Sequence, residues 1–205
     1  MTASDAFFKG MSLYTITGER KYLTPTERKR FYPALSVLEQ PAERTFVEMI
    51  YWTGCRPCEA LSMAALQVQL EDGFIVIRSA KKRGRLKGRH FRTVPVPRSF
   101  IARLDEAHGL RTLQNADDPE TTLLWPFGRT KGWRLVRTVM EEAGISGVQG
   151  CARGLRHTMG VHAIITAVPE TRLQSWLGHA DLSTTAIYVN AIGPEDRAIA
   201  RRMWQ

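Results

Sequence analysis

Apolar residues recur at helical spacing along the first third of this 205-residue chain. Proline fits the first turn of a helix, because the N–H that it lacks would have no intrahelical acceptor there. Thr24 and Glu27 flank one such proline and form a capping box. Gly54 follows a run of apolar residues and is a typical helix end. These signals predict three helices, over residues 25–38, 41–53 and 57–65.

The hydrophobic period shortens to two between residues 73 and 97. The segment GFIVIRS (73–79) is rich in β-branched residues, and HFRTVPVP (90–97) alternates apolar and polar positions, so the two predict a β-hairpin. Residues 108–124 read as a loop. Helical patterns cover residues 98–107, 130–143, 153–166, 169–177 and 183–190, with a last short helix from Pro194. Helices on both sides of one small sheet predict a mostly helical α+β domain.

Composition restricts the class of protein. No apolar run approaches the roughly 20 residues that a bilayer requires. The first residues, MTASDAFFKG, lack the pattern of a signal peptide. Three cysteines, an odd number, argue against a disulfide framework and fit a reducing compartment. We therefore expect a cytoplasmic protein with no membrane contact.

The positive charge of the chain is concentrated in one place. The net charge is +9, and residues 78–92 (RSAKKRGRLKGRHFR) hold eight of the 29 Lys and Arg residues and no acid. This basic segment lies between the two predicted strands, at the tip of the hairpin. A concentrated basic patch suits a polyanion such as nucleic acid, although a solvated loop has the same composition.

Three sequence boxes carry candidate chemistry: TGCRPCEAL from Thr53, ARGLRHT from Ala152, and LGHADLSTTAIY from Leu177. In this order, with a basic hairpin between the first and the second, they resemble the catalytic domain of the tyrosine recombinases, the phage integrase family. The resemblance runs from about residue 23 to residue 189. The matching residues are Thr53, Gly54, Arg56, Glu59 and Leu61, then Arg153, Leu155, Arg156, His157 and Thr158, and finally Leu177, Gly178, His179, Thr185 and Tyr188.

The residue types suit phosphoryl transfer at a DNA phosphodiester. Arg56 and Arg156 offer permanently charged, planar donors that can stabilise the anionic oxygens of the transition state. The resemblance implies that Tyr188 is the nucleophile, that His179 assists at the phosphate or the tyrosine proton, and that a covalent 3′-phosphotyrosine forms. It implies neither ATP, nor a metal ion, nor another cofactor. The alternative interpretations are a packing tyrosine, a His179 that only caps the helix ending at Gly178, and an Arg56–Glu59 surface ion pair.

The family uses a hairpin lysine to protonate the leaving 5′-oxygen. Lys81 follows the first strand at the usual place, while Lys82 and Lys87 are alternatives. The other basic side chains of the segment are expected to contact DNA phosphates and to give salt-dependent affinity. These candidate DNA-binding residues are Lys82, Arg83, Arg85, Lys87, Arg89 and Arg92.

Two features stand apart from the family pattern. Arg153 occupies the position of a usual histidine, and an arginine can donate to a phosphate but cannot accept a proton. If that position needs a base, the step falls to water or to His179. The pair Cys55 and Cys58 forms a C-x-x-C motif, but no second ligand pair follows at zinc spacing, so we expect neither metal nor redox function.

We divide the chain into a lead-in (1–22), a catalytic domain (23–192) and a C-terminal tail helix (193–205). The expected partners are double-stranded DNA, a homotetramer assembled on it and an accessory DNA-bending protein, in the nucleoid. The tail could dock on a neighbouring protomer or on its own core. The short lead-in resembles that of fimbrial-switch invertases, or the chain is an excised domain. Topoisomerase-like relaxation and a DNA-binding regulator weakened by Arg153 are the alternative functions.

Overall fold

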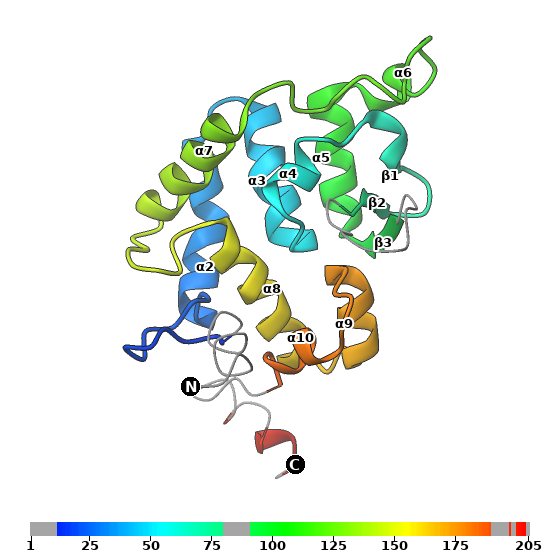
Figure 1. Ribbon diagram of the computed structural model, residues 1–205. Helices are drawn as coiled ribbons and strands as arrows, with labels where there is room; N and C mark the ends of the chain where they lie inside the picture. Colours follow the sequence, from blue (N-terminus) through cyan, green and yellow to red (C-terminus); the bar gives the residue numbers. More distant parts are fainter. Residues whose placement is uncertain (1–11, 80–90, 190–196, 198–199, 204–205) are drawn as a thin grey trace.

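The computed structural model describes residues 12–79, 91–189, 197 and 200–203, and it places a small sheet at one side of a group of helices (Figure 1). Short 3-10 turns occupy Leu35–Val37, Ala65–Gln67 and Arg201–Met203. The strands are β1 (Val68–Gln69), β2 (Phe74–Arg78) and β3 (Phe91–Pro95). The α-helices are α2 (Pro25–Ala34), α3 (Pro41–Thr53), α4 (Pro57–Ala60), α5 (Arg98–His108), α6 (Leu110–Leu113), α7 (Arg129–Glu142), α8 (Ala152–Ile165), α9 (Glu170–Leu177) and α10 (Ser183–Ala186). The predicted mostly helical α+β architecture is confirmed.

The helix boundaries follow the signals in the sequence. At the start of α2 the Thr24 hydroxyl accepts from the Glu27 N–H at 3.1 Å, and the Glu27 carboxylate accepts from the Thr24 N–H at 2.7 Å. This is the predicted capping box. Helix α3 ends because Gly54 adopts a left-handed conformation, with φ of 61°, that glycine reaches without steric cost. The chain therefore turns at Gly54, shortly before α4 begins at Pro57.

The sheet is a three-stranded antiparallel meander in the order β1-β2-β3. Ile75 pairs with Val94, and Ile77 pairs with Arg92. The predicted hairpin is thus confirmed in its strands, while its basic tip, residues 80–90, lies outside the described residues. Every second residue of β3 is buried, and these are Arg92 and Val94.

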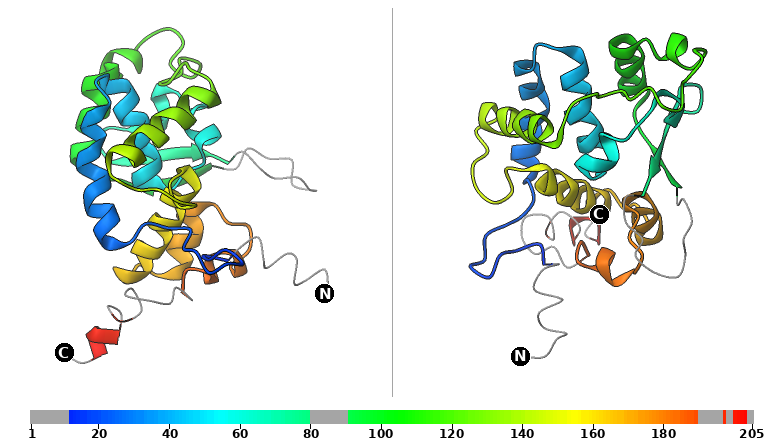
Figure 2. Two further views of the ribbon diagram at one scale, coloured as in Figure 1. Left: turned by 90° about the vertical axis from the view of Figure 1, so that its left-hand side faces the viewer. Right: turned by 45° about the horizontal axis from the view of Figure 1, so that its top comes forward.

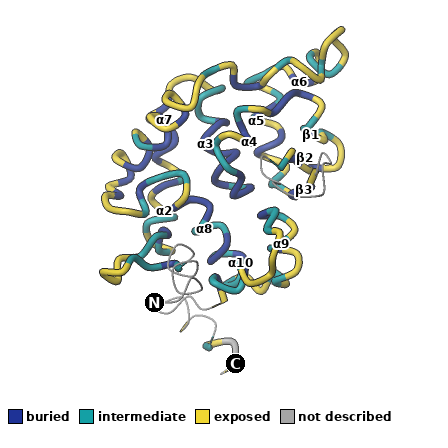
Figure 3. Tube along the Cα trace, viewed as in Figure 1, coloured by how far each residue is buried: buried dark blue, intermediate teal, exposed yellow. Residues whose placement is uncertain are grey.

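Helix α3 is the centre of the molecule and contacts α5, α7 and α8 (Figure 3). Its apolar residues belong to a core that also takes in β2, β3 and the inner faces of α5 and α7. A second, smaller cluster contains Tyr22, Val161, Leu173, Leu177 and Tyr188. Both views of Figure 2 keep α8, α9 and α10 together at one end of the molecule, so this second cluster lies at that end.

Four predicted elements differ clearly from the observed ones. Helix α2 ends at Ala34 instead of residue 38, and a 3-10 turn follows it. Helix α4 stops at Ala60 instead of residue 65, because Ala64 forms a β-bridge with Leu123 and the next turn is lost. The segment 108–124 is not all loop, since it contains α6, which is held by buried Leu110. Helix α10 ends at Ala186, within the range predicted as 183–190.

Candidate active site

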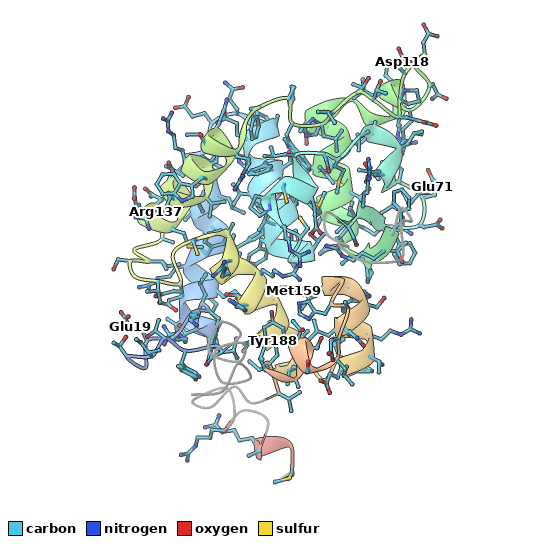
Figure 4. All side chains as sticks on the ribbon, viewed as in Figure 1. Glu19, Glu71, Asp118, Arg137, Met159 and Tyr188 are labelled. Atoms are coloured by element: carbon cyan, nitrogen blue, oxygen red, sulfur yellow. The ribbon has the colours of Figure 1, made fainter. Side chains whose placement is uncertain are left out.

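Four candidate residues from distant parts of the sequence act on one another electrostatically. Arg56 precedes α4, Arg156 lies on α8, His179 follows α9, and Tyr188 follows α10. Burial has the largest effect on the pKa of His179 and of Tyr188, and the charges of Arg156 and Arg56 have the next largest effects. Figure 4 shows Tyr188 beside α8, close to Met159. The fold therefore gathers the four residues into one site.

Arg56 is held at the surface of the site by a buried carboxylate. Its backbone N–H donates to Glu59 Oε2 at 2.8 Å, and its Nη1 donates to Glu59 Oε1 at 2.9 Å. The Arg56 side chain is 35% exposed, whereas that of Glu59 is fully buried. The ion pair that was an alternative interpretation of the sequence does form, and it leaves the Arg56 side chain partly exposed to solvent.

Arg156 is buried and joins the ends of two helices. Its Nη1 donates to the Gly54 carbonyl at 2.7 Å, and its Nη2 donates to the Leu177 carbonyl at 2.7 Å. Carbonyls at the end of a helix lack intrahelical donors and carry a partial negative charge, so a guanidinium is favourable there. Burial, followed by the charge of Arg56, lowers the pKa of Arg156 to about 10, and the group remains a cation at neutral pH.

His179 and Tyr188 stack on each other. Their ring centroids are 6.2 Å apart and the ring planes differ by 11°. His179 Nδ1 lies 2.8 Å from the Thr185 hydroxyl, which orients the imidazole. Burial, followed by the charges of Arg156 and Arg56, lowers the pKa of His179 to about 3, so its ring is neutral at physiological pH.

Tyr188 is buried, with 1% of its surface exposed. Burial raises its pKa to about 12, although the charges of Arg156 and Arg56 oppose this rise. The phenol is therefore protonated at neutral pH, and a nucleophilic role requires a group that receives its proton.

His157 contacts Tyr188 and was assigned no role from the sequence. Its Nδ1 lies 3.2 Å from the Tyr188 hydroxyl. Burial, followed by the charges of Arg156 and Arg153, lowers the pKa of His157 to about 4, so the ring is neutral and can accept a hydrogen bond at Nδ1. The sequence did signal this residue, because it matches the second box, but only the fold brings it to the tyrosine.

Gly160 makes room for the Tyr188 ring on α8. A Cβ atom at this position would lie 2.5 Å from Tyr188 Cε1 and 2.6 Å from Cζ. Such contacts are far below van der Waals distance, so the ring packs directly on the helix backbone.

Thr158, also from the second box, has another role: its hydroxyl accepts the Leu23 N–H at 2.8 Å and ties the chain just before α2 to α8.

Two catalytic candidates remain, Arg153 and Lys81, and only Arg153 lies within the described residues. Arg153 lies exposed in the first turn of α8, where its charge acts on His157. Lys81, together with the candidate DNA-binding residues Lys82, Arg83, Arg85, Lys87 and Arg89, lies outside the described residues.

Arg92 is the one candidate DNA-binding residue that lies within the described residues, and it is buried. Its side chain is only 5% exposed and forms an ion pair of 2.7 Å with Glu59. Its guanidinium is turned toward a buried carboxylate and is not presented at the surface, where a DNA phosphate would bind. The alternation of β3 contained the signal, because Arg92 shares a strand face with the buried Val94.

The cysteines of the C-x-x-C motif differ in their surroundings. Cys55 is fully buried, and burial raises its pKa to about 11, so it is a protonated thiol at neutral pH. Cys58 is exposed. Within the described residues, no group of three or more His, Cys, Asp or Glu side chains gathers in the manner of a metal site. Nor is any helix in that part of the chain long and apolar enough to cross a membrane.

Comparison with known proteins identifies the family of this chain. The Phage integrase family matches residues 21–192. Tyrosine recombinase XerA of Pyrococcus furiosus is 28% identical over 177 residues, which cover 82% of this chain and 56% of the relative. Tyrosine recombinase XerA of Thermococcus kodakarensis is 31% identical over 177 residues, which cover 82% and 57%. The chain thus spans about half the length of these relatives.

Solved structures share the fold. The crystal structure of XerA recombinase superposes with a TM-score of 0.73 at 24% identity, over 90% of this chain and 65% of the other. The XerH site-specific recombinase bound to its difH substrate, in a pre-cleavage complex, gives a TM-score of 0.69 at 22% identity, over 90% and 55%.

Proposed function

This chain belongs to the phage integrase family, and from that premise we propose that it is a site-specific DNA recombinase which cuts and rejoins DNA through Tyr188. The observation that carries the proposal is the gathering of Arg56, Arg156, His179 and Tyr188 from four separate segments. Two permanent cations beside a phenol and a neutral imidazole are a suitable set of groups for phosphoryl transfer without a metal ion. The relatives named tyrosine recombinases support the same activity.

The reaction is an in-line displacement at phosphorus. The Tyr188 oxygen forms a bond to the phosphorus atom of the scissile phosphodiester, and the bond from phosphorus to the 5′-oxygen breaks. The DNA keeps a 3′-phosphotyrosine link, and the other end becomes a free 5′-hydroxyl. Because one phosphodiester replaces another, the step needs no ATP. Attack by a 5′-hydroxyl from a partner strand reverses the chemistry, completes strand exchange and passes through a Holliday junction.

Arg56 and Arg156 stabilise the charge that develops on the nonbridging oxygens. Arg56 contributes its partly exposed side chain. Arg156 uses two of the five N–H donors of a guanidinium for the Gly54 and Leu177 carbonyls, and these bonds fix its orientation. Fixed donors do not need to reorganise as charge develops, and this is the main source of their catalytic effect.

His157 receives the phenolic proton in this proposal. Its neutral ring lies within hydrogen-bonding distance of the Tyr188 hydroxyl, while His179 Nδ1 is already bonded to Thr185. Arg153, which occupies the usual histidine position, cannot accept a proton. A bound phosphate supplies negative charge next to His157 and raises its pKa toward the range of a useful base. Arg153 then acts as a donor to the phosphate.

The proton for the leaving 5′-oxygen comes from the basic segment. Lys81 is the proposed general acid, with Lys82 and Lys87 as the alternatives within the same stretch. The arginines of the segment and its other lysines neutralise phosphates and supply affinity that falls with salt. Since Tyr188 is 1% exposed, DNA binding must also uncover its hydroxyl before attack.

Recombination of two sites requires a synapse, and we assign it to a homotetramer on double-stranded DNA, with a DNA-bending protein as an accessory partner. The tail from residue 193 supplies the contact between protomers. Met203 supports this role, since its apolar side chain is 80% exposed. Truncation before Gly193 should abolish strand exchange and tetramer assembly on DNA. If both survive truncation, the tail docks on its own core.

A suicide-substrate assay tests the proposed function. Nicked duplexes made from the DNA that flanks the coding sequence are incubated with the full chain, and denaturing gels report covalent adducts. The wild type should form an adduct, and Tyr188→Phe should form none. Relaxation of supercoiled plasmids that lack the flanking DNA would favour the topoisomerase-like alternative. Absence of an adduct on every duplex, together with sequence-selective binding, would favour the regulator.

A further inference from the structure

We propose that Arg92 is a positioning residue which connects three parts of the active site through one buried guanidinium. The inference rests on the proposed function, since positioning has meaning only for the reaction described above. The three parts are the Arg56 turn, the turn that carries His179, and the base of the hairpin that leads to Lys81.

The Arg92 guanidinium donates hydrogen bonds to three different groups. Nη2 and Nη1 donate to the two carboxylate oxygens of Glu59 at 2.7 Å and 3.3 Å. Nε donates to the Trp176 carbonyl at 2.8 Å, and Nη1 also donates to the Ser79 hydroxyl at 3.2 Å. Lysine cannot reproduce these contacts, because it has a single ammonium group in place of a planar group with several fixed donors.

The link to Arg56 runs through Glu59. The same two carboxylate oxygens accept from Arg92 and from the Nη1 and backbone N–H of Arg56. Glu59 is therefore shared between a buried arginine and a half-exposed one. By taking up part of the carboxylate charge, Arg92 keeps Arg56 from being drawn into a full bidentate pair. The partly exposed side chain of Arg56 thus stays free to meet a phosphate.

The link to His179 runs through the end of α9. Two successive carbonyls at this helix end, those of Trp176 and Leu177, accept from Arg92 and from Arg156 respectively. A Cβ atom on Gly178 would lie 3.0 Å from Arg92 Cδ, so the turn rests directly on the arginine. His179 is the next residue. The two arginines together fix the backbone from which the imidazole projects.

The link to the hairpin is made at its base. Arg92 pairs with Ile77 across the strands, and its bond to Ser79 ties the end of β2 to β3. Ser79 precedes Lys81 by two residues. A change at Arg92 therefore alters the point from which the segment with the general acid departs.

The test separates positioning from DNA contact and from a general structural role. Arg92→Met removes the charge and keeps the length of the side chain, and Arg92→Lys restores the charge without the planar fork. The matched control is Arg103→Met. Arg103 also pairs with a buried carboxylate, that of Glu48 at 2.9 Å, but it lies on α5 and has no part in the site.

Two quantities are measured for each variant: the dissociation constant for DNA, and the single-turnover rate of adduct formation at saturating protein. For Arg92→Met we expect a rate about 100-fold lower, as for an ångström-scale misplacement of reacting groups. Its dissociation constant should match the wild type, because the guanidinium is buried. Arg92→Lys should recover part of the rate, and Arg103→Met should retain all of it at temperatures where both variants are folded.

Other outcomes overturn the proposal. A rate for Arg92→Met equal to that of Arg103→Met would reduce Arg92 to a structural residue. A loss confined to the dissociation constant, with a smaller salt dependence, would make it a DNA contact. If Arg92→Met does not fold, the same comparison is made with Arg92→Lys, whose rate must then fall below that of Arg103→Met.

A measurement on the free protein keeps this proposal distinct from the proposed function. The ¹⁵N signals of the Arg56 side chain and the His179 ring should shift in Arg92→Met and stay in place in Arg103→Met. Unchanged signals in Arg92→Met would refute positioning even in an active enzyme. Shifted signals in a protein whose wild type forms no adduct would mean that the reaction, and not the arrangement, is wrongly assigned.

Discussion

Gly160→Ala tests whether Tyr188 attacks from the place where it packs on α8. The added Cβ would lie 2.5 Å from Tyr188 Cε1 and 2.7 Å from Cδ1, whereas ordinary contact begins at 3.4 Å. The ring must therefore move away from the helix by about 1 Å. This displacement also opens the contact of 3.2 Å between the Tyr188 hydroxyl and His157.

The expected cost appears in catalysis more than in stability. Alanine in place of glycine stabilises a helix interior by about 1 kcal/mol, while overpacking costs about 1–3 kcal/mol. The free energy of unfolding should thus fall by at most about 2 kcal/mol, and the protein remains folded. A misplacement of about 1 Å lowers the cleavage rate by about 100-fold.

The assay is single-turnover adduct formation at saturating protein, with urea unfolding measured on the same samples. Gly128→Ala is the control, because a Cβ atom there meets nothing within 4 Å. Cleavage by Gly160→Ala that is as fast as cleavage by Gly128→Ala, or faster, would contradict attack from this position. Either result would mean that Tyr188 leaves α8 before it attacks.

Three further predictions concern charge. Near-complete burial would ordinarily raise the pKa of Glu59, but the bonds and charge of Arg92 and the bonds of Arg56 lower it to about 2 from 4.5. At about 1.4 kcal/mol per pKa unit, the lowered pKa contributes on the order of 3 kcal/mol to the free energy of unfolding. This contribution is present above pH 4.5 and is lost as the pH falls toward 2. In urea unfolding, Glu59→Gln should lose that part of the pH dependence. If its free energy of unfolding falls with acid as steeply as that of the wild type, Glu59 is not the source of this contribution. His157→Asn should slow cleavage by about 100-fold, since asparagine cannot take the proton; a pH–rate profile that matches the wild type would remove His157 from the mechanism. Glutamine in place of Arg83, Arg85 and Arg89 should reduce the slope of log binding constant against log salt concentration by about 0.9 for each phosphate that these arginines neutralise. A slope equal to that of the wild type would show that they contact no phosphate.

The sequence predicted the parts of the fold that local chemistry determines. The Thr24–Glu27 capping box and the left-handed Gly54 mark helix ends through interactions within a few residues, so no tertiary information was needed. Helix α6 was missed because it is only four residues long and depends on distant contacts. Among these, the Gln114 amide that follows it donates to the Ala65 and Val68 carbonyls.

The site was predictable in its members but not in their arrangement. Arg56, Arg156, His179 and Tyr188 stand in boxes with a fixed order, and that order is visible in the sequence. Arg92 was grouped with the basic segment by composition, although the alternation of its strand directs it to the interior, where it pairs with Glu59. Only the three-dimensional path of α8 could bring His157 to Tyr188.

In the proposed reaction Tyr188 forms the covalent bond to DNA. The most direct measurement is mass spectrometry of the trapped adduct after protease and nuclease digestion. The expected product is a nucleotide joined through its 3′-phosphate to the peptide that contains Tyr188, and Tyr188→Phe should yield no such peptide. A nucleotide attached to any other residue, or an adduct that persists in Tyr188→Phe, would contradict this role of Tyr188.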